Sequence, residues 1–122
     1  MSKNILLIDD NPTNVEMMSY LLSAFGYSVQ GEHSGAQGLD MAHQASPDLI
    51  ICDVLMPVID GYEVARQLGA DPVLSAIPLV AVTALAMVDD RRKIIDSGFD
   101  GYIPKPIDPE TFVSEVATFL RA

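Results

Sequence analysis

Short apolar runs alternate with longer amphipathic segments along this 122-residue chain. The first run, residues 5–8, ends at two aspartates, which is typical of a strand buried on both faces. Each run is followed by a segment with apolar residues at helical spacing. The pattern therefore predicts five strand-then-helix units. The remaining strands are expected at residues 27–32, 49–52 and 79–82 and around 102–103.

Capping residues mark where the helices start and end. Asn11 followed by Pro12 predicts the start of the first helix, which Gly26 ends. The other helices are expected to begin at Ser34, at Asp60 with Glu63 as a capping-box pair, from about Met87 up to Gly98, and at Asp108-Pro109-Glu110.

Continuous apolar strands need cover on both faces, so five such units predict an α/β fold with a doubly wound, five-stranded parallel sheet. Pro104 falls in the fifth strand, and proline is tolerated in a sheet mainly at its edge. This placement fits the strand order 2-1-3-4-5 of flavodoxin-like folds. The length suits one domain, which we expect to span residues 1–122.

The charge balance narrows the choice of partners. Seventeen acidic residues against seven basic ones give a formal net charge of −10, which repels nucleic acids and anionic membranes. The uncharged stretch 77–88 is shorter than the roughly 20 residues of a membrane span, and residues 5–8 are too short for a signal peptide. We expect a cytoplasmic protein in which the single Cys52 is a reduced core residue.

Polar residues follow four of the predicted strands: Asp9 with Asp10, then Asp53, Thr83 and Lys105. In an open parallel sheet, ligands bind beyond these carboxyl ends. Three neighbouring carboxylates repel one another, and a divalent cation among them relieves the repulsion. Oxygen ligands favour Mg²⁺, for which Mn²⁺ can substitute, whereas the usual Cys and His ligands of zinc are missing.

A carboxylate beside a metal, faced by an ammonium and a hydroxyl group, can accept a phosphoryl group. Asp53 is the candidate acceptor, with Lys105 and Thr83 as contacts to the phosphoryl oxygens. The sequence has no glycine-rich motif for holding a nucleotide, so the phosphoryl group must come from another molecule.

At these spacings the chain resembles the receiver domain of two-component response regulators over residues 3–120. The resemblance implies that a histidine kinase or a phosphotransfer protein phosphorylates Asp53. It also implies a signalling module that catalyses only its own phosphorylation and dephosphorylation. The motifs that carry it are Asp9-Asp10-Asn11, Asp53-Val54-Leu55-Met56-Pro57 with Asp60-Gly61, Val82-Thr83-Ala84, and Lys105-Pro106.

The same resemblance implies roles for individual residues. Asp10 and Asp53 would bind Mg²⁺ directly, Asp9 through water, and Leu55 through its backbone carbonyl. Thr83 and Tyr102 would form the switch that responds to phosphorylation. The peptide bond before Pro106 is expected to be cis.

Output is expected through a protein-binding face made by the fourth helix, fifth strand and fifth helix. Met87 and Val88, with Ile103 and Pro104, either form an apolar docking patch there or pack into the core, and we favour packing. Arg91-Arg92-Lys93 follows two aspartates and is expected to form a helix face linked by salt bridges. We expect a stand-alone receiver that is a monomer or a weak phosphorylation-dependent dimer.

Two alternatives remain open. A small Mg²⁺-dependent phosphatase would also use Asp53, but such enzymes carry a second acid two residues later, where this chain has Leu55. A pseudo-receiver would act without phosphate, but it usually lacks an acid, the lysine or the threonine. Leu55 and Leu85 occupy positions that tune phosphate lifetime in the family, and their apolar side chains lead us to expect slow self-dephosphorylation.

Overall fold

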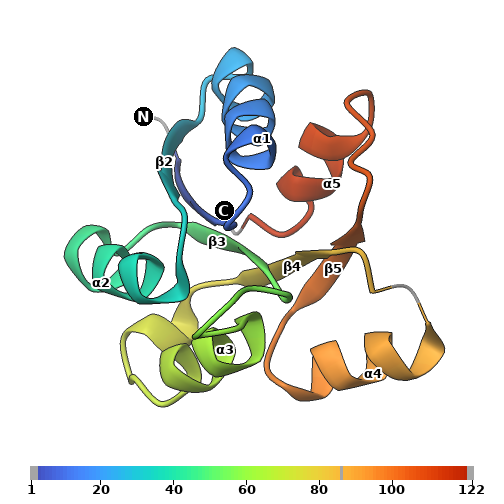
Figure 1. The fold of residues 1–122 in the computed structure, drawn as a ribbon. Helices are drawn as coiled ribbons and strands as arrows, with labels where there is room; N and C mark the ends of the chain where they lie inside the picture. Colours follow the sequence, from blue (N-terminus) through green and yellow to red (C-terminus); the bar gives the residue numbers. More distant parts are fainter. Residues whose placement is uncertain (1–2, 86, 121–122) are drawn as a thin grey trace.

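The computed structural model describes residues 3–85 and 87–120. In this part of the chain, five strands form one parallel sheet in the order β2-β1-β3-β4-β5, which confirms the predicted fold (Figure 1). The strands are β1 (Asn4–Ile8), β2 (Ser28–Glu32), β3 (Leu49–Asp53), β4 (Leu79–Thr83) and β5 (Gly101–Pro104). The helices are α1 (Pro12–Ala24), α2 (Gly35–Ala45), α3 (Gly61–Gly69), α4 (Val88–Asp96) and α5 (Phe112–Ala117), with a short 3-10 helix η1 (Leu74–Ala76).

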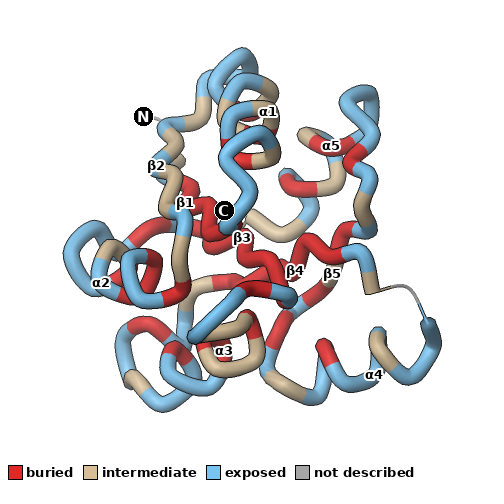
Figure 2. Tube along the Cα trace, viewed as in Figure 1, coloured by how far each residue is buried: buried red, intermediate tan, exposed pale blue. Residues whose placement is uncertain are grey.

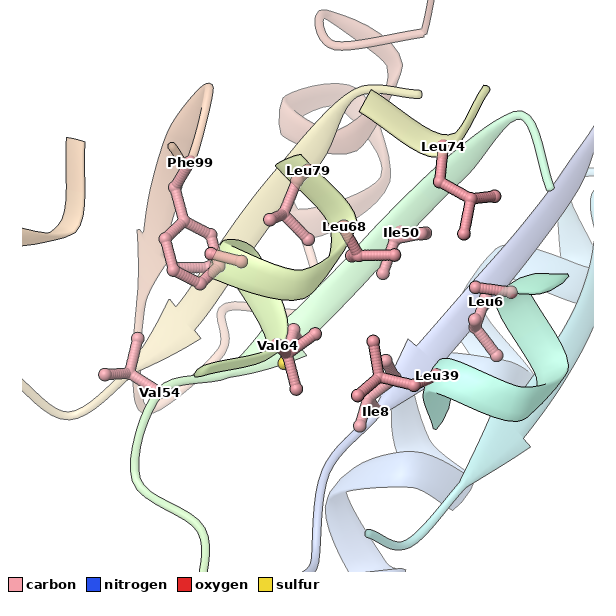
Figure 3. Packing of buried hydrophobic residues seen from close by; sticks show 14 of the residues in the cluster. Leu6, Ile8, Leu39, Ile50, Val54, Val64, Leu68, Leu74, Leu79 and Phe99 are labelled. Carbon is pink, nitrogen blue, oxygen red and sulfur yellow. The ribbon is translucent and has the colours of Figure 1, made fainter. Parts of the chain in front are cut away.

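The helices cover the two faces of the sheet, with α1 and α5 on one side and α2, α3 and α4 on the other (Figure 1). Alternate residues of each central strand enter one of two apolar clusters. In β3, for example, Ile50 packs toward α2 and α3 (Figure 3), whereas Ile51 packs toward α1 and α5. Strands β1, β3 and β4 form the buried centre of the molecule (Figure 2), so their carboxyl ends are held at one rigid edge.

Three of the predicted helix caps are confirmed. The side chain of Asn11 accepts hydrogen bonds from the first turn of α1, Ser34 accepts one at the start of α2, and Asp60 accepts one from the Glu63 N–H at 2.9 Å. The reciprocal half of the capping box does not form, because the Glu63 carboxylate binds Arg66 instead.

The last helix begins later than predicted: its N-cap position is Thr111, which makes no side-chain cap, rather than Asp108. The Asp108 side chain accepts a hydrogen bond from the Glu110 N–H at 2.9 Å, which closes a local turn. The Asp108 carbonyl accepts the N–H of Phe112, and α5 begins only there. Asp108 therefore belongs to the turn before the helix.

Helix α4 starts at about Met87 as predicted, but the packing of its first residues differs from the expectation. Met87 and Val88 are exposed rather than packed in the core, while Ile103 is buried. A helix turns one stripe of side chains toward the sheet, and in α4 that stripe contains Ile94, whereas Val88 and Ile95 lie on another side.

The basic run of α4 does not form the expected salt bridges among the residues that the structure describes. Arg91 and Lys93 instead lie over the rings of Tyr102 and Tyr62. None of the helices in the described ranges has the length and apolar character needed to cross a membrane.

Candidate functional site

The carboxyl ends of four strands bring the predicted site residues together. Asp9 directly follows β1 and Asp53 ends β3, and these strands are paired neighbours. Thr83 ends β4, which pairs with β3 on its other side. Lys105 follows β5, and its N–H donates to the carbonyl of Thr83 at 2.8 Å. The sheet edge therefore presents all four side chains to one region.

Lys105 pairs with two buried carboxylates. Its Nζ lies 3.0 Å from Asp9 Oδ2 and 3.3 Å from Asp53 Oδ2. Asp9 is fully buried and Asp53 is 5% exposed, so solvent screens these charges poorly. The other oxygen of each carboxylate is held by the backbone: Asp9 Oδ1 accepts the N–H of Asn11 at 2.9 Å, and Asp53 Oδ1 accepts that of Leu55 at 3.2 Å.

Burial raises the pKa of the Asp53 carboxyl group, and the negative charge of Asp9 raises it further, against the opposing effect of Lys105. Burial alone would lower the pKa of Lys105, but its ion pairs with Asp9 and Asp53 outweigh that effect and raise it. Lys105 is therefore a fixed positive charge, whereas the carboxylates are only partly compensated.

Asp9, Asp10 and Asp53 form a group of oxygen donors suited to a metal ion. Carboxylate oxygens from the three residues lie within 4.8 Å of one another. With Lys105 counted, three negative charges and one positive charge leave an excess of two negative charges, which a divalent cation neutralises. Asp10 is exposed, so the site is open to water, which Mg²⁺ retains as ligands. The donor set thus fits Mg²⁺.

Thr83 and Tyr102 lie on the same face of adjacent strands. Thr83 is buried, and its Oγ1 accepts a hydrogen bond from the N–H of Leu85 at 3.0 Å. Tyr102 pairs in register with Ala81, two residues before Thr83, and its half-buried ring packs against the cluster under α3 and α4. The two expected switch residues are therefore close along the sheet without being directly paired.

The loop from β3 to α3 is shaped by two unusual backbone positions. Val58 has a φ of 66°, and the N–H of Ile59 next to it donates to the carbonyl of Pro57, which makes a tight three-residue turn. At Gly61, a Cβ atom would lie 2.6 Å from the Asp53 carbonyl oxygen and from Val54 Cα. Only glycine lets α3 begin this close to the site.

The remaining predicted residues are found near this edge. Leu55 lies in this loop and is 52% exposed, and Leu85 is half-buried. The Lys105–Pro106 peptide bond is cis, as expected.

Two supporting contacts were not anticipated from the sequence. The N–H of Asn11 fixes the Asp9 carboxylate, and the N–H of Leu85 binds the Thr83 hydroxyl. Both join a polar side chain to the amide two residues later, a local pattern common for Asp and Thr. The sequence Asp9-Asp10-Asn11 contains this pattern, so the first contact could have been predicted from it.

Comparisons with known proteins agree with this geometry. Residues 5–117 match the response regulator receiver domain family. The chain is similar to the polar-differentiation response regulator DivK of Brucella ovis, with 37% identity over 98% of each chain. Among solved structures, it is similar to chemotaxis protein CheY4 of Vibrio cholerae, with 28% identity, a TM-score of 0.93, and 98% of this chain and 100% of that one covered. The receiver domain of sensor histidine kinase PA1611 from Pseudomonas aeruginosa PAO1, which has a magnesium ion coordinated in its active site cleft, matches with 29% identity, a TM-score of 0.88 and 98% coverage of both chains.

Proposed function

The chain belongs to the response regulator receiver domain family, and from that premise we propose that Asp53 accepts a phosphoryl group from a histidine kinase or a phosphotransfer protein. The observation that carries the proposal is the contact between Asp53 and Lys105. A buried carboxylate at the strand end is held in place by an ammonium group and lies in a group of carboxylates suited to Mg²⁺.

Asp10 and Asp53 are the direct metal ligands in this proposal, Asp9 acts through water, and Leu55 contributes its backbone carbonyl. The similar PA1611 receiver supports a metal site of this kind, since a magnesium ion is coordinated in its active site cleft. Bound Mg²⁺, or Mn²⁺ in its place, neutralises charge on the phosphoryl oxygens during transfer.

The side chains of this protein position the transfer. A carboxylate oxygen of Asp53 forms a bond to phosphorus while the P–N bond of the donor phosphohistidine breaks. The electron pair stays on the imidazole nitrogen, which takes a proton from water. Lys105 binds one phosphoryl oxygen, and the Thr83 hydroxyl donates to another once it turns toward it. The protein thus catalyses only its own phosphorylation and dephosphorylation.

Phosphorylation is read out by Thr83 and Tyr102 and changes a protein-binding face made by α4, β5 and α5. We assign residues 1–122 to a single receiver domain that acts in the cytoplasm, as a monomer or a weak phosphorylation-dependent dimer. The net charge of −10 disfavours nucleic acid as its target.

Intact mass spectrometry after incubation with acetyl phosphate and Mg²⁺ tests the proposal. One added phosphoryl group is expected on the native protein and none on Asp53→Asn. Asp40→Asn, which changes an exposed aspartate of α2, is the matched control and should be modified like the native protein. No addition to any variant would favour a phosphorylation-independent module, and rapid steady release of phosphate would favour a phosphatase.

A further inference from the structure

A pocket of about 250 Å³ lies between α2 and the amino-terminal parts of β1 and β2. The phosphoryl site lies beyond the carboxyl ends of the strands, and the two sites share no residue. The lining of the pocket includes Leu6, Ser28 and Gln30 from the strands, and Met41, Ala45 and Pro47 from α2 and the segment after it.

Small side chains of α2 leave this space open. Near the start of α2, Gly38 lets the helix lie directly against the sheet, since a Cβ atom there would collide with the side chain of Ile8. Ala45 follows seven residues later on the same side of the helix, and its methyl group leaves the space beside Leu6 unfilled. The pocket is thus built mainly from a helix and two strands, so it is formed before any ligand binds.

The lining combines apolar surface with a hydrogen-bond acceptor. Leu6, which lies beside α2 (Figure 3), presents apolar surface together with Met41 and Pro47. Leu6 pairs in register with Gln30, so both side chains are on the α2 face of the sheet. Gln30 Nε2 donates to Glu32 Oε1 at 3.1 Å, which leaves the Gln30 oxygen Oε1 as an acceptor.

The charges around the pocket select against ionic ligands. Among the described residues that line it, none has a charged side chain. Asp48 and Glu32 border the pocket, since they accept hydrogen bonds from the lining residues Asn4 and Gln30. An anion would lose its hydration without a positive partner and would be repelled by both acids, and a cation would have no carboxylate in the lining. These conditions favour a neutral molecule.

We propose that this pocket is a binding site for a neutral, mainly apolar small molecule that carries an N–H donor for Gln30 Oε1. Its volume is below the range of roughly 300–1,000 Å³ for pockets that hold drug-sized ligands, so it suits a molecule of roughly ten non-hydrogen atoms. An aromatic ring fits the lining well, because the Met41 thioether makes favourable contacts with such rings. The site goes beyond the phosphoryl chemistry and does not depend on it.

Titration of the ¹⁵N-labelled protein, followed by ¹H–¹⁵N NMR, tests the proposal with three probes of similar size. Benzamide is neutral and has N–H donors, acetophenone has a methyl group in place of the amide nitrogen, and benzoate has a charged oxygen there. Benzamide should shift the backbone signals of Ser28, Gln30, Met41 and Ala45 and saturate them in the millimolar range. Acetophenone should bind about two- to tenfold more weakly, the effect of one lost hydrogen bond. Benzoate should bind at least about tenfold more weakly.

Variants of the pocket locate the binding. Ala45→Leu fills the space and should abolish the shifts caused by benzamide. Ala36→Leu is the matched control, because Ala36 is an exposed alanine of the same helix outside the pocket lining, and it should bind benzamide like the native protein. Gln30→Met keeps the length of the side chain without its acceptor, so it should bind benzamide no better than acetophenone. Asp53→Asn should bind benzamide as the native protein does.

Undiminished benzamide binding by Ala45→Leu would overturn the proposed site. Equal affinities of the native protein for benzamide and acetophenone would overturn the donor contact to Gln30. Saturable binding of benzoate at the same residues would overturn the argument from charge. All these outcomes are measured without phosphorylation, so a failure here is distinct from a failure of Asp53 to accept a phosphoryl group.

Discussion

The Lys105 ammonium group lies 3.3 Å from Asp53 Oδ2, in contact with the carboxylate whose ionised form burial disfavours. The same ammonium group lies 3.0 Å from Asp9 Oδ2, so one positive charge serves two buried negative charges. The site therefore keeps an excess of negative charge that the fold tolerates at a cost in stability. The charges that serve the function thus lower the stability of the fold, so unfolding experiments can measure their effect.

Replacing Asp53 by Asn should stabilise the metal-free protein at pH 7, by an amount on the order of 1 kcal/mol. The folded state raises the pKa of Asp53, so it binds the proton more tightly than the unfolded chain does. Native stability contributed by this group is therefore lost as the pH rises above the unfolded pKa of about 4 and through the raised folded pKa. The advantage of Asp53→Asn should vanish below about pH 4. Urea unfolding of both proteins between pH 3.5 and 8 measures this, and a gain that is independent of pH would contradict it.

Mg²⁺ should raise the free energy of unfolding of the native protein, by about 2.7 kcal/mol at a hundred times its dissociation constant. Asp10→Asn should weaken this effect, because it removes one carboxylate from the group of three. Asp10 is exposed, so the substitution should leave the metal-free fold intact. Asp89→Asn, at an exposed position of α4, is the control. Equal Mg²⁺ responses in the two variants, measured by thermal unfolding, would rule out the proposed ligand.

Gly61→Ala should destabilise the protein by about 1–3 kcal/mol, since the new Cβ meets backbone atoms that cannot move aside. The added Cβ meets the Asp53 carbonyl and displaces the loop that directly follows Asp53, so phosphorylation by acetyl phosphate should also slow. Gly69→Ala is the matched substitution in the same helix, with nothing within 4 Å of the added Cβ. It should be neutral or stabilising by up to about 1 kcal/mol. Comparable losses in both variants would show that close approach at Gly61 is unimportant.

Val58→Gly should stabilise the protein by about 0.5–1 kcal/mol. A left-handed conformation costs an L-residue about 1–2 kcal/mol, and the substitution removes this cost. The greater freedom of glycine in the unfolded chain offsets part of the stabilisation. Val58 is fully exposed, so the substitution removes no buried apolar contact. Val73→Gly provides the control, because Val73 is exposed with an ordinary φ of −85° and should only lose stability. Urea unfolding of both variants measures whether each substitution raises or lowers the free energy of unfolding.

The sheet and the main site residues could be predicted because each depends on local chemistry. Apolar runs identify the strands, and the parallel arrangement places Asp9, Asp53 and Thr83 at one edge whatever the details of packing.

The start of α5 could not be predicted this way. Asp108 is suited both to a helix cap and to a turn, and here its hydrogen bonds from Glu110 and Phe112 close a turn while α5 itself begins only at Phe112.

The contacts of α4 were also beyond the sequence pattern. Arg91 and Lys93 follow two aspartates, which favours local ion pairs, yet both side chains reach tyrosines on other elements. Tyr62 and Tyr102 come near α4 only because the fold places α3 and β5 beside it, which no local spacing encodes. Likewise, the left-handed φ of Val58 contradicts the preference of a β-branched residue and follows from closing the loop between Asp53 and Gly61.

The phosphorylated protein should lose its phosphoryl group slowly. Hydrolysis needs a water molecule aimed at phosphorus, and polar side chains near the acceptor can orient one. Here the two positions hold Leu55, which is two residues after Asp53 and 52% exposed, and Leu85, which is half-buried and packs against the core. Both side chains are aliphatic, so neither can hydrogen-bond to water. Leu55→Asn should accelerate dephosphorylation by about tenfold or more, as expected for a polar group that positions the attacking water. The substitution leaves the backbone carbonyl at position 55 in place, so metal binding should persist.

Val73→Asn introduces the same side chain far from the site in the chain and should have no effect. The measurement is the decay of phosphorylated mass after removal of acetyl phosphate in Mg²⁺, and a native half-life of seconds would refute the role assigned to these two leucines.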